Sequence, residues 1–249
     1  MHSKILLLDI ETSPNIGYTW GKWEVDVIEF IQNWHLLSFS YKWLGGKTEV
    51  RALPDYPCYK AGSDDKNLIK DLWKLLDEAE IVVAQNGDKF DIRKINTRFL
   101  HFKMSPPSPY RTVDTLKIAR KHFAFNSNKL NDISQDLGEG EKFKHEGFGL
   151  WKGCMAGDKR SWDLMKKYNK QDVELLEKAY RRFLPFAANH PNMAVYSGEM
   201  SCSKCGSSRL QARGEIVNRT SQYQRWQCMS CGGWSKSIKG NRIAKFVNA

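Results

Sequence analysis

The chain has 249 residues, of which 41% are hydrophobic and 27% charged, proportions typical of a folded protein rather than a disordered one. Lys and Arg outnumber Asp and Glu by 39 to 28, a net charge of +11. Such an excess favours a polyanion, either nucleic acid or an anionic membrane surface. No apolar run is long enough for a membrane span and no signal peptide is visible, so a cytoplasmic location is expected by default.

The first predicted element is a strand at residues 4–14, which read KILLLDIETSP. An unbroken apolar run that ends at Ser-Pro predicts a buried central strand. Because strand side chains alternate between faces, Asp9 and Glu11 project to the same side. Neighbouring carboxylates repel each other, and a divalent cation between them would relieve that repulsion. The alternative, that the strand simply ends and both acids are solvated, remains open for this motif alone.

The other elements are predicted from the hydrophobic period of each stretch. Residues 15–30 show no period and are expected to be irregular. A helical stripe at residues 64–80 opens with the capping residues Ser63, Asp64 and Asp65. Further strands are predicted at residues 34–43, 48–53 and 81–84. Further helices are predicted from Asp91 to before Pro106, after Asp114, at 129–137 and at 161–184, and residues 139–158 are expected to form a loop. This order predicts an α/β fold with a mixed β-sheet flanked by helices.

Two more acidic positions follow along the chain. The strand at 81–84 runs into QNGDKFD, which places Asp91 at a strand-to-helix junction, a common position for active-site groups. An ordinary helix N-cap is the competing interpretation of Asp91. On the last long helix, Tyr168 and Asp172 are four residues apart and therefore share a face, about 6 Å apart at Cβ. A core aromatic residue is the competing interpretation of Tyr168.

The segments LLLDIET, AQNGDKFD and YNKQD, in this order, resemble the three exonuclease motifs of the DEDD 3′-to-5′ exonuclease superfamily. The resemblance covers residues 4–185 and implies an RNase H-like fold. It also implies two Mg²⁺ or Mn²⁺ ions as cofactors and a two-metal-ion mechanism. Tyr168 marks the tyrosine branch (DEDDy), because Lys167 stands where the histidine branch requires His. The implied metal-binding acids are Asp9, Glu11, Asp91 and Asp172.

The resemblance also implies a role for each of these residues. Asp9 would bridge both ions, Glu11 and Asp172 would hold the ion that activates water, and Asp91 would support the second ion. Tyr168 would orient the attacking water. The main chain around Thr12 and the side chain of Asn86 are expected to contact the terminal nucleotide.

Four of the six cysteines form the pattern Cys-x2-Cys-x22-Cys-x2-Cys, with a glycine after each pair: Cys202, Cys205, Cys228 and Cys231. Two such pairs predict one structural Zn²⁺ in a zinc ribbon, since four unrelated thiols would not explain the repeat. Residues 198–249 carry nine Lys or Arg against two Asp or Glu, a net charge of +7. Arg225, Trp226 and Trp234 are therefore expected to contact nucleic acid. Zinc ribbons that bind proteins, and tryptophans that shield the zinc, are the alternatives.

The sequence as a whole predicts a nuclease domain at residues 1–185, a linker at 186–200 and a basic zinc ribbon with four cysteine ligands at 201–249. The expected function is removal of nucleoside 5′-monophosphates from the 3′ ends of single-stranded DNA, in proofreading or DNA processing. The rival activity is a 3′-to-5′ exoribonuclease. A rival from another class is an inactive nucleic-acid-binding or polymerase-accessory protein. A separate polymerase or replication protein is a candidate partner, no membrane partner is expected, and the compact layout suggests a viral origin, with the host cytoplasm as location.

Overall fold

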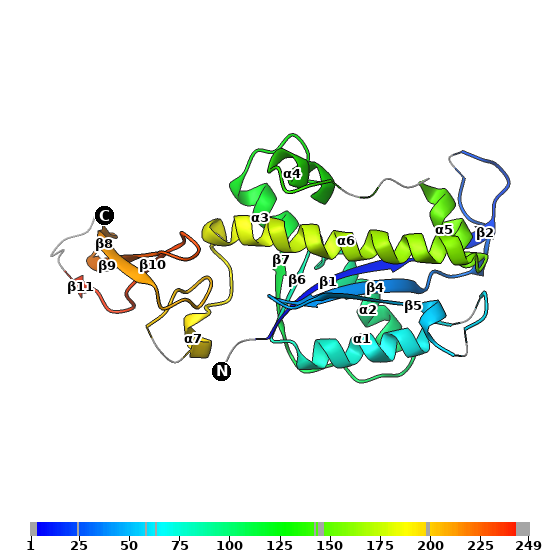
Figure 1. Ribbon diagram of the computed structural model, residues 1–249, viewed down its shortest axis with the longest axis horizontal. Helices are drawn as coiled ribbons and strands as arrows, with labels where there is room; N and C mark the ends of the chain where they lie inside the picture. The colour runs from blue at the N-terminus through cyan, green and yellow to red at the C-terminus, as the bar shows by residue number, and fades with distance from the viewer. Residues whose placement is uncertain are drawn as a thin grey trace. The chain divides into compact units, whose positions relative to one another are not determined.

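The structure is a computed structural model that describes residues 4–23, 25–57, 59–62, 64–141, 143, 147–197 and 200–242 (Figure 1). The chain divides into two compact units. The sheet unit consists of the described parts of Lys4–Lys117 and Phe125–Ala179. The cysteine unit consists of the described parts of Ile118–Ala124 and Tyr180–Ala249.

The sheet unit is organised around β1 (Ile5–Thr12), the middle strand of a five-stranded sheet with the order β5-β4-β1-β6-β7. β1 pairs with β4 antiparallel and with β6 parallel, so the sheet is mixed. Its first four residues are all at most 5% exposed, because helices cover both faces. The predicted α/β fold with a mixed sheet and flanking helices is therefore confirmed. The other strands are β4 (Leu36–Trp43), β5 (Thr48–Ala52), β6 (Ile81–Ala84) and β7 (Arg111–Asp114).

The helices of the sheet unit form two layers. α1 (Lys66–Glu78) and α2 (Asp91–His101) lie on one face of the sheet, and α6 (Lys159–Phe183) crosses the other (Figure 1). The connections carry η1 (Leu53–Asp55), α3 (Thr115–His122) and α4 (Leu130–Asp136). All the predicted helices are confirmed, with ends within a few residues of the expected ones. Among the described residues, no helix has the length and apolar character needed to cross a bilayer.

The start of α1 differs from the predicted capping cluster. Asp64 does accept a 3.0 Å hydrogen bond from the Lys66 backbone N–H. Asp65 instead points into the core, where it accepts a 2.6 Å hydrogen bond from the Leu36 N–H and pairs with the Arg98 guanidinium. Ser63 lies outside the described residues. The Asp65 side chain therefore links α1 to α2 and β4 and does not cap the start of α1.

Two predictions about connections were wrong, and one strand was not predicted. Residues 15–30 are not irregular but contain β2 (Ile16–Tyr18), which pairs with β3 (Glu29–Gln32) in a hairpin. Most apolar side chains of the hairpin are exposed, so neither face is buried and its sequence lacks the alternation of apolar and polar residues that predicts a strand. The expected loop at 139–158 contains α5 (Phe148–Met155), whose Leu150 and Cys154 are buried. β7 was missed because two of its four residues are exposed and polar. Residues 142 and 144–146 lie outside the described residues.

The cysteine unit contains a four-stranded antiparallel sheet in which β9 pairs with each of the other three strands. The residues expected to form a linker are partly ordered into η2 (Leu184–Phe186) and α7 (Ala194–Ser197). In this stretch Met193 donates a 3.0 Å backbone hydrogen bond to the Ser203 carbonyl. The strands are β8 (Leu210–Val217), β9 (Ser221–Cys228), β10 (Trp234–Lys236) and β11 (Asn241–Arg242).

Candidate active site and cysteine cluster

Three carboxylates from two elements meet at the end of β1. Asp9 and Glu11 project from β1, Asp172 projects from α6, and one oxygen of each lies within 4.8 Å of the others. Asp172 is only 2% exposed. Three ionised carboxylates this close repel one another strongly, and hard oxygen ligands are those that Mg²⁺ and Mn²⁺ prefer. The donor set therefore fits a divalent cation.

Asn169 on α6 fixes the orientation of Asp9. Its side-chain amide donates a 2.6 Å hydrogen bond to Asp9 Oδ2, and the same group lies 3.3 Å from the Asp9 carbonyl oxygen. Both Asp9 oxygens are acceptors, so the NH2 end of the amide faces Asp9. The other end, Asn169 Oδ1, accepts a 3.0 Å hydrogen bond from the Ser38 hydroxyl on β4. Asn169 is fully buried. The sequence offered no signal for it, because an asparagine within a helical stripe shows nothing of its partner across the fold.

Tyr168 precedes Asn169 on the same helix and is half-buried. Its ring lies against Trp151 of α5, with centroids 6.1 Å apart at an interplanar angle of 72°. This edge-to-face arrangement is a favourable aromatic contact. α5, which sequence analysis missed, therefore supports the tyrosine expected to be catalytic.

Asp91 begins α2 and is not part of the group of three acids. Its carboxylate is 3% exposed and accepts a 3.1 Å hydrogen bond from the Ile10 backbone N–H, between Asp9 and Glu11. Burial is the main cause that raises the pKa of Asp91 to about 7. Asp91 is thus hydrogen-bonded to β1 at the residue between its two acids.

The turn before Asp91 depends on two unusual backbone positions. Asn86 has φ +62°, in the left-handed region, and a Cβ at Gly87 would lie 2.4 Å from Ala84 Cβ. The Asp114 carboxylate accepts hydrogen bonds from the N–H groups of Asn86 (2.9 Å) and Leu116 (3.0 Å). Asp114 therefore caps α3, the helix predicted after it, and also holds this turn. Asn86 is not among the residues that line the pocket described next, so its contact with a nucleotide stays a prediction.

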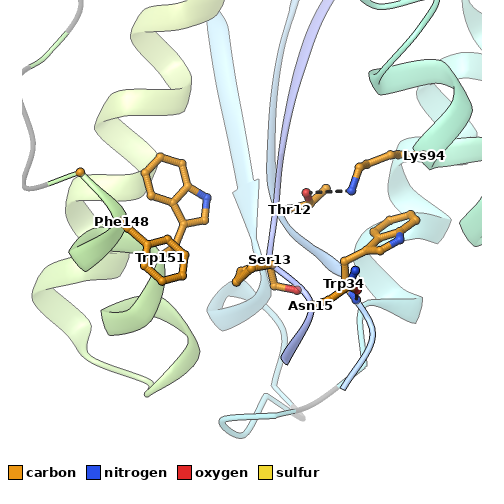
Figure 2. Close-up of a pocket in the computed structure, with 9 residues that line it drawn as sticks. Thr12, Ser13, Asn15, Trp34, Lys94, Phe148 and Trp151 are labelled. Carbon is orange, nitrogen blue, oxygen red and sulfur yellow. Dashed lines mark hydrogen bonds between the residues drawn. The ribbon is translucent and has the colours of Figure 1, made fainter. Parts of the chain in front are cut away.

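A pocket of about 540 Å³ opens next to the acids, at the end of β1. Thr12, which directly follows Glu11, lies in its wall, so the predicted site residue Thr12 faces this space. Figure 2 shows aromatic side chains on two sides: Trp34 on one, Phe148 and Trp151 of α5 on the other. The complete lining is Thr12, Ser13, Pro14, Asn15, Trp34, Lys94, Gly147, Phe148 and Trp151.

Lys94 supplies the positive charge in this pocket. Its Nζ lies 3.3 Å from Thr12 Oγ1 and 3.9 Å from the centre of the Trp34 ring, and burial lowers its pKa. A cation that is partly desolvated attracts an anion more strongly than one in bulk water. Aromatic walls and one cation suit a ligand with flat rings and a phosphate. The four-residue spacing of Leu150 and Cys154 was a sequence signal for α5, but Gly149 and Gly153 within the helix obscured it.

The four expected zinc ligands form a second cluster, in the cysteine unit. Their Sγ atoms all lie within 4.8 Å of one another, with 3.7 Å between Cys202 and Cys231 and 3.6 Å between Cys205 and Cys228. Four sulfurs about 2.3 Å from a tetrahedral zinc would be roughly 3.8 Å apart. Gly206 and Gly232 have φ of +74° and +78°, which lets the chain turn tightly after each pair. The cluster therefore fits a Zn²⁺ ion.

The residues expected to bind nucleic acid in this unit do not share one face. Trp234 pairs with Gln227 and Lys236 with Arg225, so Arg225 and Trp234 lie on the same face of the β9–β10 pair. The Arg225 guanidinium lies 4.7 Å from the Trp234 ring centre. Trp226 lies on the opposite face, because side chains alternate along β9. It shares that face with Cys228, one of the expected zinc ligands.

Comparisons with known proteins bear on the sheet unit. Residues 43–184 match the family model of the RNase H superfamily. Among solved structures, the chain is similar to the family B DNA polymerase from the hyperthermophilic archaeon Pyrobaculum calidifontis, with a TM-score of 0.56 at 13% sequence identity. The similarity covers 88% of this chain and 32% of the polymerase chain, so the chain spans about a third of that protein. No curated protein matches the chain.

Proposed function

Because the chain belongs to the RNase H superfamily, we propose that it is a metal-dependent 3′-to-5′ exonuclease of the DEDDy type that acts on single-stranded DNA. One observation carries the proposal: Asp9, Glu11 and Asp172 converge within 4.8 Å beside a pocket with aromatic walls. Acids alone would fit many metal sites, and aromatic walls alone would fit many ligands. Together they suit a phosphodiester next to an unpaired base.

The residues of the site divide the work as follows. Asp9, Glu11 and Asp172 would hold Mg²⁺ or Mn²⁺, and Asp91, which is hydrogen-bonded to β1, would support the second ion. Two such ions would offset the charge that develops on the scissile phosphate and would lower the pKa of the attacking water. The Tyr168 hydroxyl would orient that water, and Trp151 would keep the tyrosine ring in place. The product would be a nucleoside 5′-monophosphate.

The pocket would bind the terminal nucleotide. Trp34 on one side, and Phe148 and Trp151 on the other, would stack on the base, while Lys94 would attract a phosphate. Stacking of a base on an aromatic side chain contributes about 1–3 kcal/mol and does not depend on base identity. A duplex end would have to unpair before its base could enter, which favours single strands.

The cysteine unit would add affinity for nucleic acid. We assign this role to the face with Arg225 and Trp234, where Lys236 also lies 4.2 Å from the Tyr223 ring centre. Alternating cations and aromatic rings suit a single strand, because cations contact phosphates and rings stack on bases. This proposal includes one structural Zn²⁺ held by the four cysteines, and the division into a nuclease domain, a linker and a ribbon.

Oligonucleotides blocked at either the 3′ or the 5′ end test the activity. With Mn²⁺ present, the wild-type chain should degrade 5′-blocked single-stranded DNA to nucleoside 5′-monophosphates and leave 3′-blocked DNA intact. Asp9→Ala and Asp172→Asn should be inactive. Equal degradation by wild type and Asp9→Ala, or none by either, would reject the proposal. Faster degradation of the matching RNA would replace DNA with RNA as the substrate.

A primer–template with a mismatched 3′ end tests the role in proofreading. The wild-type chain should remove a mismatched terminal nucleotide faster than a paired one, because the mismatched base is already unpaired. Equal rates would argue against proofreading and for general processing of DNA ends. Adding a separate polymerase to the same reaction shows whether excision and resynthesis are coupled.

A further inference from the structure

The β2–β3 hairpin exposes an unusual amount of aromatic surface. Trp20 is 92% exposed, Trp23 77% and Tyr18 60%, and Phe30 and Ile31 are also exposed. Several large apolar side chains exposed on one short element often mark a binding surface. Single aliphatic side chains are often exposed on protein surfaces and need no explanation. Two exposed tryptophans on one short hairpin are less usual, because each is a large apolar side chain.

The hairpin begins and ends at the pocket. Pro14 and Asn15 lead into β2, Trp34 follows β3, and all three line the pocket beside the acids. The Trp34 backbone N–H donates a 2.8 Å hydrogen bond to Asn15 Oδ1, which closes the base of the hairpin. Figure 2 shows Asn15 and Trp34 next to each other on the pocket wall. A strand that leaves the pocket on this side therefore meets the hairpin next.

The pocket is too small for more than the end of a strand. Its volume of about 540 Å³ lies in the range that encloses a single small ligand. The nucleotides before the reacting end must therefore lie outside it. Their bases are unpaired in a single strand and expose apolar faces that stack well on tryptophan and tyrosine.

The charges near the hairpin favour bases over phosphates as the contact. Lys22 is held over the Trp23 ring, with its Nζ 5.1 Å from the ring centre. Asp26 and Glu29 are the described acids of the same segment. The described charged residues of the hairpin, Lys22, Asp26 and Glu29, sum to −1, so the hairpin has no net positive charge to attract phosphates, whereas its aromatic rings can stack on bases. In this arrangement Lys94, in the pocket, would contact the phosphate of the terminal nucleotide.

We propose that the described part of the hairpin, residues 16–23 and 25–32, is a base-stacking platform for the unpaired nucleotides just upstream of the reacting 3′ end. This inference rests on the proposed function and makes it more specific. The enzyme would select single strands, or frayed duplex ends, that are long enough to reach Trp20 and Trp23. A duplex cannot use the platform, because its bases already stack on one another.

Hydrolysis of substrates of increasing length tests the platform. For wild type, kcat/KM should rise from a trinucleotide to a single strand of about 12 nucleotides as stacking is added. The Trp20→Ala/Trp23→Ala variant should match wild type on the trinucleotide and lose about 10- to 100-fold on the longer strand. Trp20→Phe/Trp23→Phe should keep most of the gain, because phenylalanine also stacks. Leu100→Ala, an equally exposed apolar position on α2, is the matched control and should change nothing.

Binding measured without hydrolysis separates this inference from the proposed activity. With Asp9→Ala added to every chain to stop hydrolysis, and without a chelator that would remove the zinc, the anisotropy of a labelled strand of the same length should show weaker binding to the alanine pair. Binding to the phenylalanine pair should stay close to that of the chain with Asp9→Ala alone. If that holds while wild type hydrolyses nothing, the platform stands and the nuclease assignment fails. If wild type hydrolyses DNA but the alanine pair loses activity equally at all lengths, or not at all, the platform is rejected. A dimer in sedimentation that the alanine pair abolishes would also overturn it, because a second copy would then cover the hairpin.

Discussion

Asn169 and Asp9 are 160 residues apart in the chain and are joined by a 2.6 Å hydrogen bond from Asn169 Nδ2 to Asp9 Oδ2. This bond couples α6 to β1 at the point where their carboxylates converge. Asn169 is a positioning residue: it leaves Asp9 one defined orientation toward Glu11 and Asp172. The acidic group therefore depends on a neutral side chain that no charge pattern would single out.

Asn169→Ala should reduce kcat/KM by roughly 10- to 100-fold, because a hydrogen bond to a charged group contributes about 1.5–3 kcal/mol. It should also raise the Mn²⁺ concentration needed for half-maximal activity, since Asp9 would no longer be held in place. A merely structural role would lower stability without shifting the metal dependence. Lys170→Ala, on the exposed side of the same helix, is the control and should leave both quantities unchanged.

Asp65→Ala should lower the free energy of unfolding by about 3–5 kcal/mol, because it leaves the Arg98 guanidinium buried without its partner. Arg98 Nε lies 3.1 Å from Asp65 Oδ1, and Asp65 is fully buried. Urea denaturation measures the effect. Asp64→Ala, which removes only an exposed capping bond, should lower the same free energy by about 1 kcal/mol. Equal effects of the two variants would contradict the assignment.

His35 should make the sheet unit less stable in weak acid. Burial, the largest cause, lowers its pKa below 6.5 in the folded chain, although the Asp65 carboxylate acts in the opposite direction. The unfolded chain therefore binds the proton more readily. The stabilising contribution is complete above about pH 6.5 and is lost as pH falls through that value toward the lower folded pKa.

Denaturation of wild type and His35→Gln at several pH values measures this contribution. The two free energies of unfolding should converge as the pH falls from 7.5 to 5. Curves that stay parallel over this range would show that His35 does not titrate as its burial implies.

The cysteine cluster should bind one zinc ion per chain. Cys228→Ser should lose the metal and make the described strands β8, β9 and β10 sensitive to protease, because so small a unit has little other core. Elemental analysis and limited proteolysis measure the two effects. Ser230→Ala, between Cys228 and Cys231, should keep the zinc. A metal-free wild-type chain with protected strands would contradict the prediction.

The basic face of the cysteine unit should set part of the salt dependence of binding. Arg225→Ala and Lys236→Ala should each reduce the slope of log K against log salt by about 0.7 for a single strand. Trp234→Ala should weaken binding through the loss of stacking, whereas Trp226→Ala, on the opposite face, should not. Equal weakening by the two variants would contradict the assignment of the face.

Local sequence patterns predicted much of this molecule. The apolar run at residues 5–8 predicted β1, and the apolar stripes at residues 64–80 and 161–184 predicted α1 and α6. The spacing of the cysteines predicted that four thiols would lie together. The match to the RNase H superfamily confirms the predicted fold. These features follow from short-range rules: a buried strand needs an unbroken apolar run, and a packed helix needs one apolar stripe.

The surroundings of the acids depended on contacts between residues far apart in the chain. Asn169 holds Asp9, Trp151 contacts Tyr168, and Trp34 faces α5 across the pocket. The sequence showed each of these as an ordinary polar or aromatic residue, because a hydrogen bond or ring contact across the fold leaves no periodic trace. The hairpin was not predicted for a different reason. Neither of its faces is buried, so its apolar and polar residues do not alternate as they do in a half-buried strand. Folding alone brought these groups to the end of β1.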